Sequence, residues 1–349
     1  MLSNRDTTSI LLKKKRQWWS HNASQTALLL QGDLCSTNQS AFLTNSRSTL
    51  EIGKLVSPIS SIAVNIVPHR HSRLLLIRSN AFEGNTSIHL CFLPLNVTKI
   101  GRFAFSASNL QYIIFSRNSR LKIIDCGAFD SCVKPICITI PSSLEILGSS
   151  AFMDSSLHHI SFGLNSLVKE IEASTFWNCH KLSSILVPSS VELISQFAFY
   201  LSSIESLRFE PKSKLRQIRL YAIQECPNLT SIEIPASVEE IEKYAFLRTP
   251  FQTISFSPDS RLKIIGMGAF SENPNLTNIR FPSSLEEIQE NAFMLTGLQS
   301  ISFADDSRLR SIEVGAFLPC NLKNIQLPVC AKIHPMAFAA GNSVRPDQQ

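Results

Sequence analysis

The stretch Leu276–Phe317 decides the fold of this chain. It reads LTNIRFPSSLEEIQENAF, then MLTG, then LQSISFADDSRLRSIEVGAF. Both halves open with L-x-x-I-x-F, pass a turn, continue with S-L-x-x-I or S-R-L-x-x-I, and end in Ala-Phe. Two copies of one pattern in direct succession predict a repeat protein, and the pattern recurs along most of the sequence.

The ends of the units show how regular this repeat is. An Ala-Phe dipeptide, or a close equivalent, ends each unit at Ala81-Phe82, Ala104-Phe105, Ala128-Phe129, Ala151-Phe152, Thr175-Phe176, Ala198-Phe199, Ala222-Ile223, Ala245-Phe246, Ala269-Phe270, Ala292-Phe293, Ala316-Phe317 and Ala337-Phe338. Successive ends lie 23 and 24 residues apart in alternation, until a last step of 21. We therefore expect about twelve coils that follow a 47-residue period in pairs.

One unit in the middle of the chain indicates how a coil folds. Ile232 and Ile234 alternate with polar neighbours, as in a half-buried strand, and Pro235 ends that strand because it has no N–H to donate. Val238 and Ile241 then return inward, and Ala-Phe closes the coil in a short helical or turn segment. Stacked copies place equivalent residues about 4.8 Å apart. The pattern predicts a mainly parallel β solenoid, roughly 50–60 Å long.

The regular register begins at Ile66 and divides the chain into four parts. These are a polar basic tail (1–26), a degenerate first repeat with an insertion (27–65), the solenoid (66–338) and a C-terminal tail (339–349). Lys13–Arg16 beside Trp18-Trp19 is interpreted as solvated, with a nuclear or membrane-surface signal as the alternative. The insertion covers 43–61, and an atypical terminal repeat is expected because one of its sides faces water.

Composition excludes several classes of protein. Hydrophobic residues make up 44% and charged residues 17%, which is enough apolar material for a long core. The net charge of +6 is too diffuse for a nucleic-acid module, and no apolar run has the length of an integral membrane segment. No signal peptide is recognised. Nine cysteines without regular pairing argue against a disulfide framework or structural zinc. We also expect a soluble monomer without a cofactor.

One face of the predicted solenoid carries charges of alternating sign. The longer units hold Lys122, Lys169, Arg216, Lys263 and Arg310, and the shorter units hold Glu145, Glu192, Glu239 and Glu286. Members of each set are 47 residues apart, so stacked coils alternate plus and minus. Opposite charges on adjacent strands attract and like charges repel. We interpret this charge ladder as a structural device that sets the register, rather than as a ligand site.

Two further sets of residues recur with the repeat. A basic row consists of Arg73, Arg120, Lys214, Arg261 and Arg308. We interpret this row as a solvated face, with binding of an acidic partner or polyanion as the alternative. Four cysteines fall three residues after a closing Phe or its equivalent: Cys132, Cys179, Cys226 and Cys320. Their regular placement predicts small core residues rather than reactive thiols.

The units resemble the BspA-like branch of the leucine-rich repeats. The resemblance rests on L-x-x-I-x-[IF]-P, S-[LV]-x-x-I and A-F in units of 23–24 residues, and it covers Ile66–Phe338. It implies a leucine-rich repeat solenoid without the Asn ladder of the commoner repeats. It also implies a cell-surface or secreted protein that binds other proteins, often in attachment to host cells. The family has no catalytic residues to transfer.

The strand residues that point away from the core form the candidate binding face. Its large side chains are Tyr112, Ile114, His159, Leu186, Arg208 and Arg280. Aromatic residues and Arg are common interface anchors, so we predict that this face contacts a protein partner of unknown identity. Ordinary surface variation is the alternative interpretation.

Three functional hypotheses remain open from the sequence. The first is a non-enzymatic protein-binding module of the surface or adhesion type, by resemblance. The second is an intracellular scaffold or adaptor, which the missing signal peptide and the odd cysteine count favour. The third, an enzyme, would require a grafted catalytic site, for which 43–61 offers the sizeable insertion.

Overall fold

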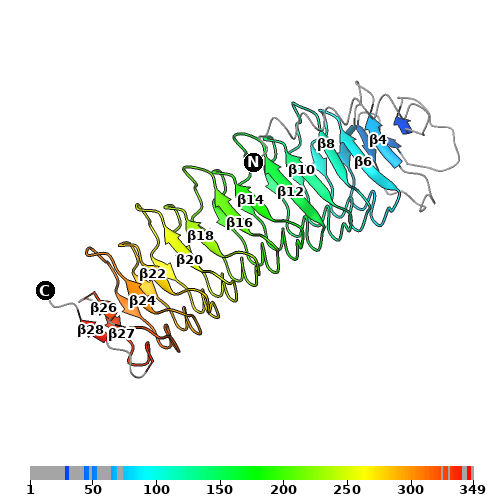
Figure 1. The fold of residues 1–349 in the computed structure, drawn as a ribbon. Helices are drawn as coiled ribbons and strands as arrows, with labels where there is room; N and C mark the ends of the chain where they lie inside the picture. The colour runs from blue at the N-terminus through cyan, green and yellow to red at the C-terminus, as the bar shows by residue number, and fades with distance from the viewer. Residues whose placement is uncertain are drawn as a thin grey trace.

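The computed structural model describes residues 28–30, 43–46, 49–52, 64–68, 74–323, 325–328, 331–339 and 344–346. Over these residues the chain forms an elongated stack of coils, which Figure 1 follows from blue to red. Pairing between coils is parallel, and the described residues contain no helix. The predicted parallel β solenoid of about twelve coils is confirmed.

Each coil contributes a longer strand to one face and a short strand to another. The longer strands form the strand face: β1 (Leu28–Leu30), β4 (Val64–Pro68), β6 (Ile88–Leu93), β8 (Tyr112–Phe115), β10 (Ile136–Ile140), β12 (Leu157–Phe162), β14 (Ser184–Val187), β16 (Ser206–Phe209), β18 (Ser231–Ile234), β20 (Thr253–Phe256), β22 (Asn278–Arg280), β24 (Ser300–Ser302), β26 (Ile325–Leu327) and β28 (Val344–Pro346).

The second set forms the short-strand face: β2 (Leu43–Ser46), β3 (Thr49–Ile52), β5 (Leu74–Ile77), β7 (Lys99–Ile100), β9 (Ile123–Ile124), β11 (Ile146–Leu147), β13 (Glu170–Ile171), β15 (Leu193–Ile194), β17 (Gln217–Ile218), β19 (Glu240–Ile241), β21 (Ile264–Ile265), β23 (Glu287–Ile288), β25 (Ser311–Ile312) and β27 (Lys332–Ile333). Its pairing is parallel except for β2 and β3, which pair with each other in antiparallel fashion; β3 then joins β5. These two strands lie within the predicted insertion.

Stacked phenylalanines form the axis of the core. The Phe that closes each coil lies almost parallel to the Phe of the next coil, as in the pair Phe105 and Phe129, whose ring centroids are 5.5 Å apart at an angle of 1°. Both side chains are fully buried. Ile223 holds this place in one coil, between Phe199 and Phe246. The high Phe content of the chain therefore follows from the repeat.

The closing segments are turns, not helical turns. Most of them cross into the left-handed backbone region twice, as at Tyr244 and Arg248, both with φ of 55°. Two such residues four positions apart are incompatible with a right-handed helix. The freed backbone groups bond to the next coil instead, for example from Phe246 N to Ala269 O at 2.8 Å.

Candidate protein-binding surface

The predicted binding residues share the strand face but do not form one cluster. Tyr112, on β8, and His159, on β12, lie in one row with the exposed Cys137 of β10 between them. Leu186 of β14 and Arg208 of β16 are direct register neighbours. All four of these predicted residues are exposed, and the exposed fraction of Leu186 is 50%.

The other two members of the predicted set are less favourably placed. Ile114, also on β8, is only partly exposed. Arg280 is exposed but lies on β22, away from the rest along the stack. The structure thus concentrates the set into a row around β8–β12 and a pair on β14 and β16.

The ladder of the strand face is interrupted at every second coil from β14 onward. Hydrogen-bonded pairs are β14 with β16, β18 with β20, and β22 with β24, whereas β16 and β18 belong to separate sheets. Equivalent residues within a pair are 22 apart in sequence, as Leu186 is from Arg208, and across the interruption they are 25 apart, as Arg208 is from Glu233. The 47-residue period therefore contains one closed and one open step.

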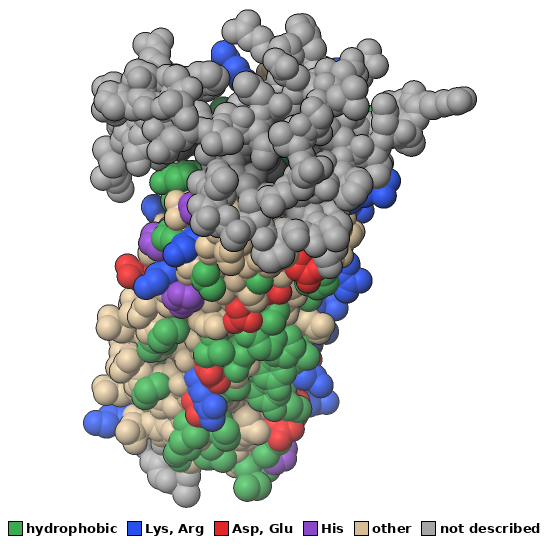
Figure 2. All heavy atoms as spheres, turned by 90° about the vertical axis from the view of Figure 1, so that its right-hand side faces the viewer, with side chains coloured by type: hydrophobic (Ala, Val, Ile, Leu, Met, Phe, Trp, Pro, Cys, Tyr) green, Lys and Arg blue, Asp and Glu red, His purple; other side chains and the backbone are tan. Residues whose placement is uncertain are grey.

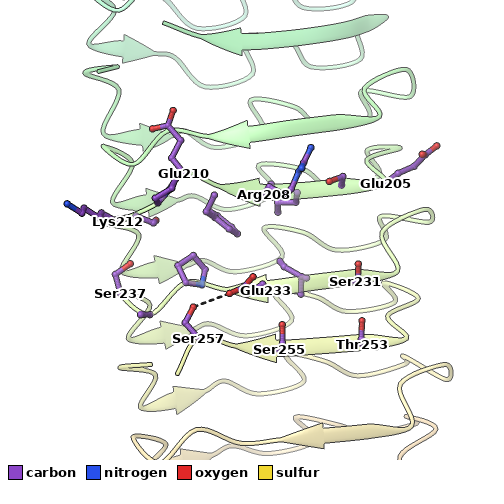
Figure 3. Close-up of a pocket in the computed structure, with 18 residues that line it drawn as sticks. Glu205, Arg208, Glu210, Lys212, Ser231, Glu233, Ser237, Thr253, Ser255 and Ser257 are labelled. Carbon is purple, nitrogen blue, oxygen red and sulfur yellow. Dashed lines mark hydrogen bonds between the residues drawn. The ribbon is translucent and has the colours of Figure 1, made fainter. Parts of the chain in front are cut away.

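A hollow of about 570 Å³ lies over the open step between β16 and β18. Figure 3 shows the hydroxyl groups of Ser231 on β18 and of Thr253 and Ser255 on β20, and Lys212 beyond the end of β16. The exposed Arg208 also lines the hollow. The surface combines hydrogen-bonding hydroxyls with charges of both signs, a composition suited to a polar segment of another protein.

One hydroxyl in the hollow is left without a hydrogen-bond partner. Among the described residues, Ser237 Oγ is the buried side-chain oxygen that no group satisfies. The equivalent Ser190 and Ser284 donate to the carbonyls of Val168 and Leu262 at 2.7 and 2.8 Å. Ser237 therefore departs from the repeat in its hydrogen bonding.

The charge ladder consists of discrete ion pairs. Lys122 Nζ lies 3.0 Å from Glu145 Oε1, and corresponding pairs are Lys169–Glu192 at 3.1 Å and Arg216–Glu239 at 3.3 Å. At the next period Glu286 pairs with Arg310, at 3.0 Å, so the partner of this Glu lies on the opposite side from that of the other three. These side chains are partly to largely exposed, so each pair is worth little alone. A register-setting role remains a prediction.

Replacing Glu239 by Lys tests that role. The change puts a second cation beside Arg216 and turns an attraction into a repulsion. We therefore expect a lower melting temperature at low salt, with a loss of no more than about 1 kcal/mol of stability. The loss should shrink as salt screens the charges. Asp305→Lys, a charge reversal at an exposed position away from the ladder, is the control. An unchanged melting temperature at low salt would contradict the ladder.

The basic row is exposed where the structure describes it. Four members of the row lie at the surface: Arg120, Lys214, Arg261 and Arg308. Arg73 is outside the described residues.

Within the described part of the chain, no group of three His, Cys, Asp or Glu side chains converges as a metal site would require. No described helix has the length and hydropathy of a membrane span.

The recurring cysteines are buried, as predicted, and their thiols bond across coils. Cys179 Sγ donates to Phe152 O at 3.1 Å, and burial raises the pKa of Cys179 to about 12. Such a thiol is almost entirely protonated at neutral pH and is therefore unreactive. Asn273, which is fully buried, holds the same place one period after Cys226 and donates to three carbonyls, an equivalence that the sequence reading missed.

The closing turns carry an aromatic cluster that the sequence analysis also overlooked. Five aromatic rings form a continuous series of contacts, with the centroids of contacting rings 4.8–5.9 Å apart. They belong to Trp177, Phe197, Tyr200, Tyr221 and Tyr244. All are partly exposed. The signal was present, because these residues directly precede or follow the closing dipeptides, but it becomes visible only when those positions are compared across coils.

The architecture is that of a leucine-rich repeat solenoid with an open strand face. The sequence model of the BspA type leucine-rich repeat region matches in six copies, over residues 21–134, 61–179, 115–229, 161–259 and 216–345. These matches span most of the chain, which therefore belongs to the BspA type leucine-rich repeat family. No curated protein matches the chain.

Two solved bacterial structures have a similar fold. The pneumococcal vaccine antigen PcpA is 17% identical with a TM-score of 0.50, and the match covers 88% of this chain and 96% of that one. A leucine-rich repeat protein from Bacteroides ovatus is 21% identical with a TM-score of 0.48, covering 90% of this chain and all of the other. At these identities the likeness concerns the fold alone. Proteins of this repeat class commonly mediate protein interactions, and their fold is typically non-enzymatic.

Proposed function

We propose that this protein is a non-enzymatic protein-binding module whose strand face holds a polar segment of its partner. The hollow between β16 and β18 carries the proposal, because it combines the exposed Arg208 with a row of hydroxyls. Leu186, beside Arg208, supplies an apolar anchor at its edge. Arg is enriched among the residues that contribute most to the free energy of binding at protein interfaces.

Photo-cross-linking from the hollow tests this proposal. A benzophenone amino acid at Ser231 of the full chain would capture the partner, which mass spectrometry then identifies and a titration characterises. We expect Arg208→Glu to weaken binding by more than about tenfold, because it reverses the exposed charge in the hollow. Lys332→Glu, an exposed change on β27, should leave binding unaltered. Equal affinities of the two variants, or a hydrolase or transferase activity that persists through purification, would contradict the proposal.

We further propose a cell-surface or secreted location, which rests on the family and on PcpA being a vaccine antigen. Labelling of intact cells with an impermeant reagent should then modify the protein. Recovery from the cytosolic fraction alone would favour the intracellular scaffold instead.

A further inference from the structure

The aromatic cluster on the closing turns forms a continuous ridge, defined here as Trp177, Phe197, Tyr200, Tyr221 and Tyr244. Trp177 contacts both Phe197, at 5.3 Å, and Tyr200, at 4.8 Å. From Phe197 the ridge continues through Tyr221 to Tyr244 in two stacked contacts of 5.2 Å. Figure 2 shows hydrophobic side chains gathered into one area of the face that it views, with acidic and basic side chains at its border.

The fold does not require aromatic residues at these positions. Phe197, Tyr221 and Tyr244 have φ of 57°, 56° and 55°, a left-handed conformation that is unfavourable for bulky side chains. Most other coils place Asn, Ser or Gly at the equivalent position, as at Ser150, Ser174, Asn291 and Gly315. Gly and Asn tolerate the left-handed region better, and Ser places little bulk there. Phe103 is the other aromatic residue at this position among the described coils, with φ of 52°, so three successive aromatic residues carry a conformational cost that most coils avoid.

The neighbours extend the apolar character of the ridge. Leu201, next to Tyr200, is 38% exposed. Tyr244 packs over Gly268 of the following coil, where a Cβ atom would lie 2.4 Å from the Tyr244 ring, and its hydroxyl donates to Met267 Sδ at 3.4 Å. Because the central rings stack on one another, their edges rather than their faces are left to meet a partner.

Carboxylates border the ridge at its amino-terminal end. The Asp154 amide donates to Trp177 O at 2.9 Å, which places Asp154 directly beside the ridge. Asp154 accepts from Asn178 at 2.7 Å, and Asp130 accepts from Ser131 at 3.1 Å; neither contact supplies a positive charge. Burial, together with repulsion from Asp154, raises the pKa of Asp130. A cation from a partner would relieve this repulsion.

The charges along the other borders of the ridge do not outweigh these carboxylates. Arg248 lies between Glu225 and Glu272, at 3.5 and 2.8 Å, which leaves that group of three with one excess negative charge. Arg219 pairs with Glu242 at 3.4 Å, and Lys243 is an exposed cation beside Tyr244. The surroundings as a whole are therefore acidic around an apolar centre.

We propose that this ridge is a second docking surface, and that it binds a basic, apolar segment of a partner protein. Aliphatic side chains of the segment pack on the ring edges and Leu201, while Lys or Arg side chains reach Asp130 and Asp154. An aromatic centre with a charged rim is the usual anatomy of a protein interface. The surface is separate from the hollow between β16 and β18, so the two proposals can fail independently.

Trp177 provides a direct reporter of binding. In the full chain with Trp18→Phe and Trp19→Phe, tryptophan fluorescence comes from Trp177 alone. Three synthetic peptides of equal length serve as probes, built from Leu-Lys, Leu-Glu and Ser-Lys repeats. We expect the Leu-Lys peptide to change the fluorescence in a saturable way. The Leu-Glu and Ser-Lys peptides should bind more than about tenfold more weakly, because each lacks one of the two required features.

Matched variants separate binding from folding. Phe197→Ser with Tyr221→Ser keeps a residue type that other coils already use in this conformation, and Asp130→Asn with Asp154→Asn keeps the shapes of the side chains. Each double variant should bind the Leu-Lys peptide more than about tenfold more weakly, with an unchanged circular dichroism spectrum. Arg208→Glu should leave the affinity for this peptide unchanged. Equal binding of Leu-Lys and Leu-Glu, or full binding by both double variants, overturns the proposal. Dimerisation of the chain through the ridge also overturns it. Sedimentation would then show a dimer, and the Trp177 fluorescence would change with protein concentration in the absence of peptide.

Discussion

Phe129→Ala is expected to lower the free energy of unfolding by about 3–5 kcal/mol, the range for truncating a buried Phe. Phe129 is fully buried and stacks between Phe105 and Phe152, at 5.5 and 5.1 Å. The truncation leaves a cavity on the core axis that the rigid backbone of two adjoining coils cannot close. The measurement is urea unfolding of the full chain, followed by circular dichroism.

A solenoid adds a second expectation for this variant. Each coil contacts only its neighbours, so damage at one interface weakens the coupling between the two sides. We expect the unfolding transition of Phe129→Ala to broaden or divide into two. Leu164→Ala is the control, because Leu164 is 86% exposed and its truncation should change stability by less than about 0.5 kcal/mol. A loss below about 1 kcal/mol for Phe129→Ala would show that the stack does not support the fold.

Asn273→Ala should destabilise the protein by about 1–3 kcal/mol, and Asn273→Cys by clearly less. Asn273 Nδ2 donates to the carbonyl oxygens of Phe246, Phe270 and Ser271 at 3.1, 2.8 and 3.1 Å. Alanine leaves these buried acceptors without that donor, and their desolvation is no longer compensated. Thermal unfolding of the two variants, measured side by side, gives the comparison.

Cysteine is the matched control because the repeat already uses it in this place. One period earlier, Cys226 Sγ donates to Phe199 O at 3.1 Å, the carbonyl that corresponds to Phe246 O. The thiol should therefore restore the cross-coil bond to Phe246 and part of the lost stability. Equal losses for the Ala and Cys variants would show that the position matters for its volume and not for its donor.

The fold was predictable from the sequence because a repeat reports its own register. Pro235 marked a strand end, the spacing of the Ala-Phe dipeptides set the length of the coils, and both are local properties of the chain. The burial of Cys132, Cys179, Cys226 and Cys320 followed from the same periodicity. A position that recurs in register meets its own equivalents in the stack, so its environment repeats as well.

The candidate sites were only partly predictable. The sequence pointed to the strand face and to Arg208, but it did not show that the ladder opens between β16 and β18, because the 25-residue step could have been absorbed in any loop. It predicted alternating charges, yet the pairing of Glu286 with Arg310 depends on side-chain conformations. The ridge was missed because its residues are divided between the positions before and after the closing dipeptides, and their rings meet only across turns.

By itself, then, the sequence determined the solenoid, the coil length, the apolar axis and the family, all of which follow from periodic burial of equivalent residues. Only the tertiary structure decided which coils separate, which hydroxyl stays unsatisfied at Ser237 and which aromatic residues adjoin Asp154. The physical reason is that stacking is a nearest-neighbour property written into each repeat. Hollows and ridges arise instead from departures from the repeat, whose geometry is set by packing between coils.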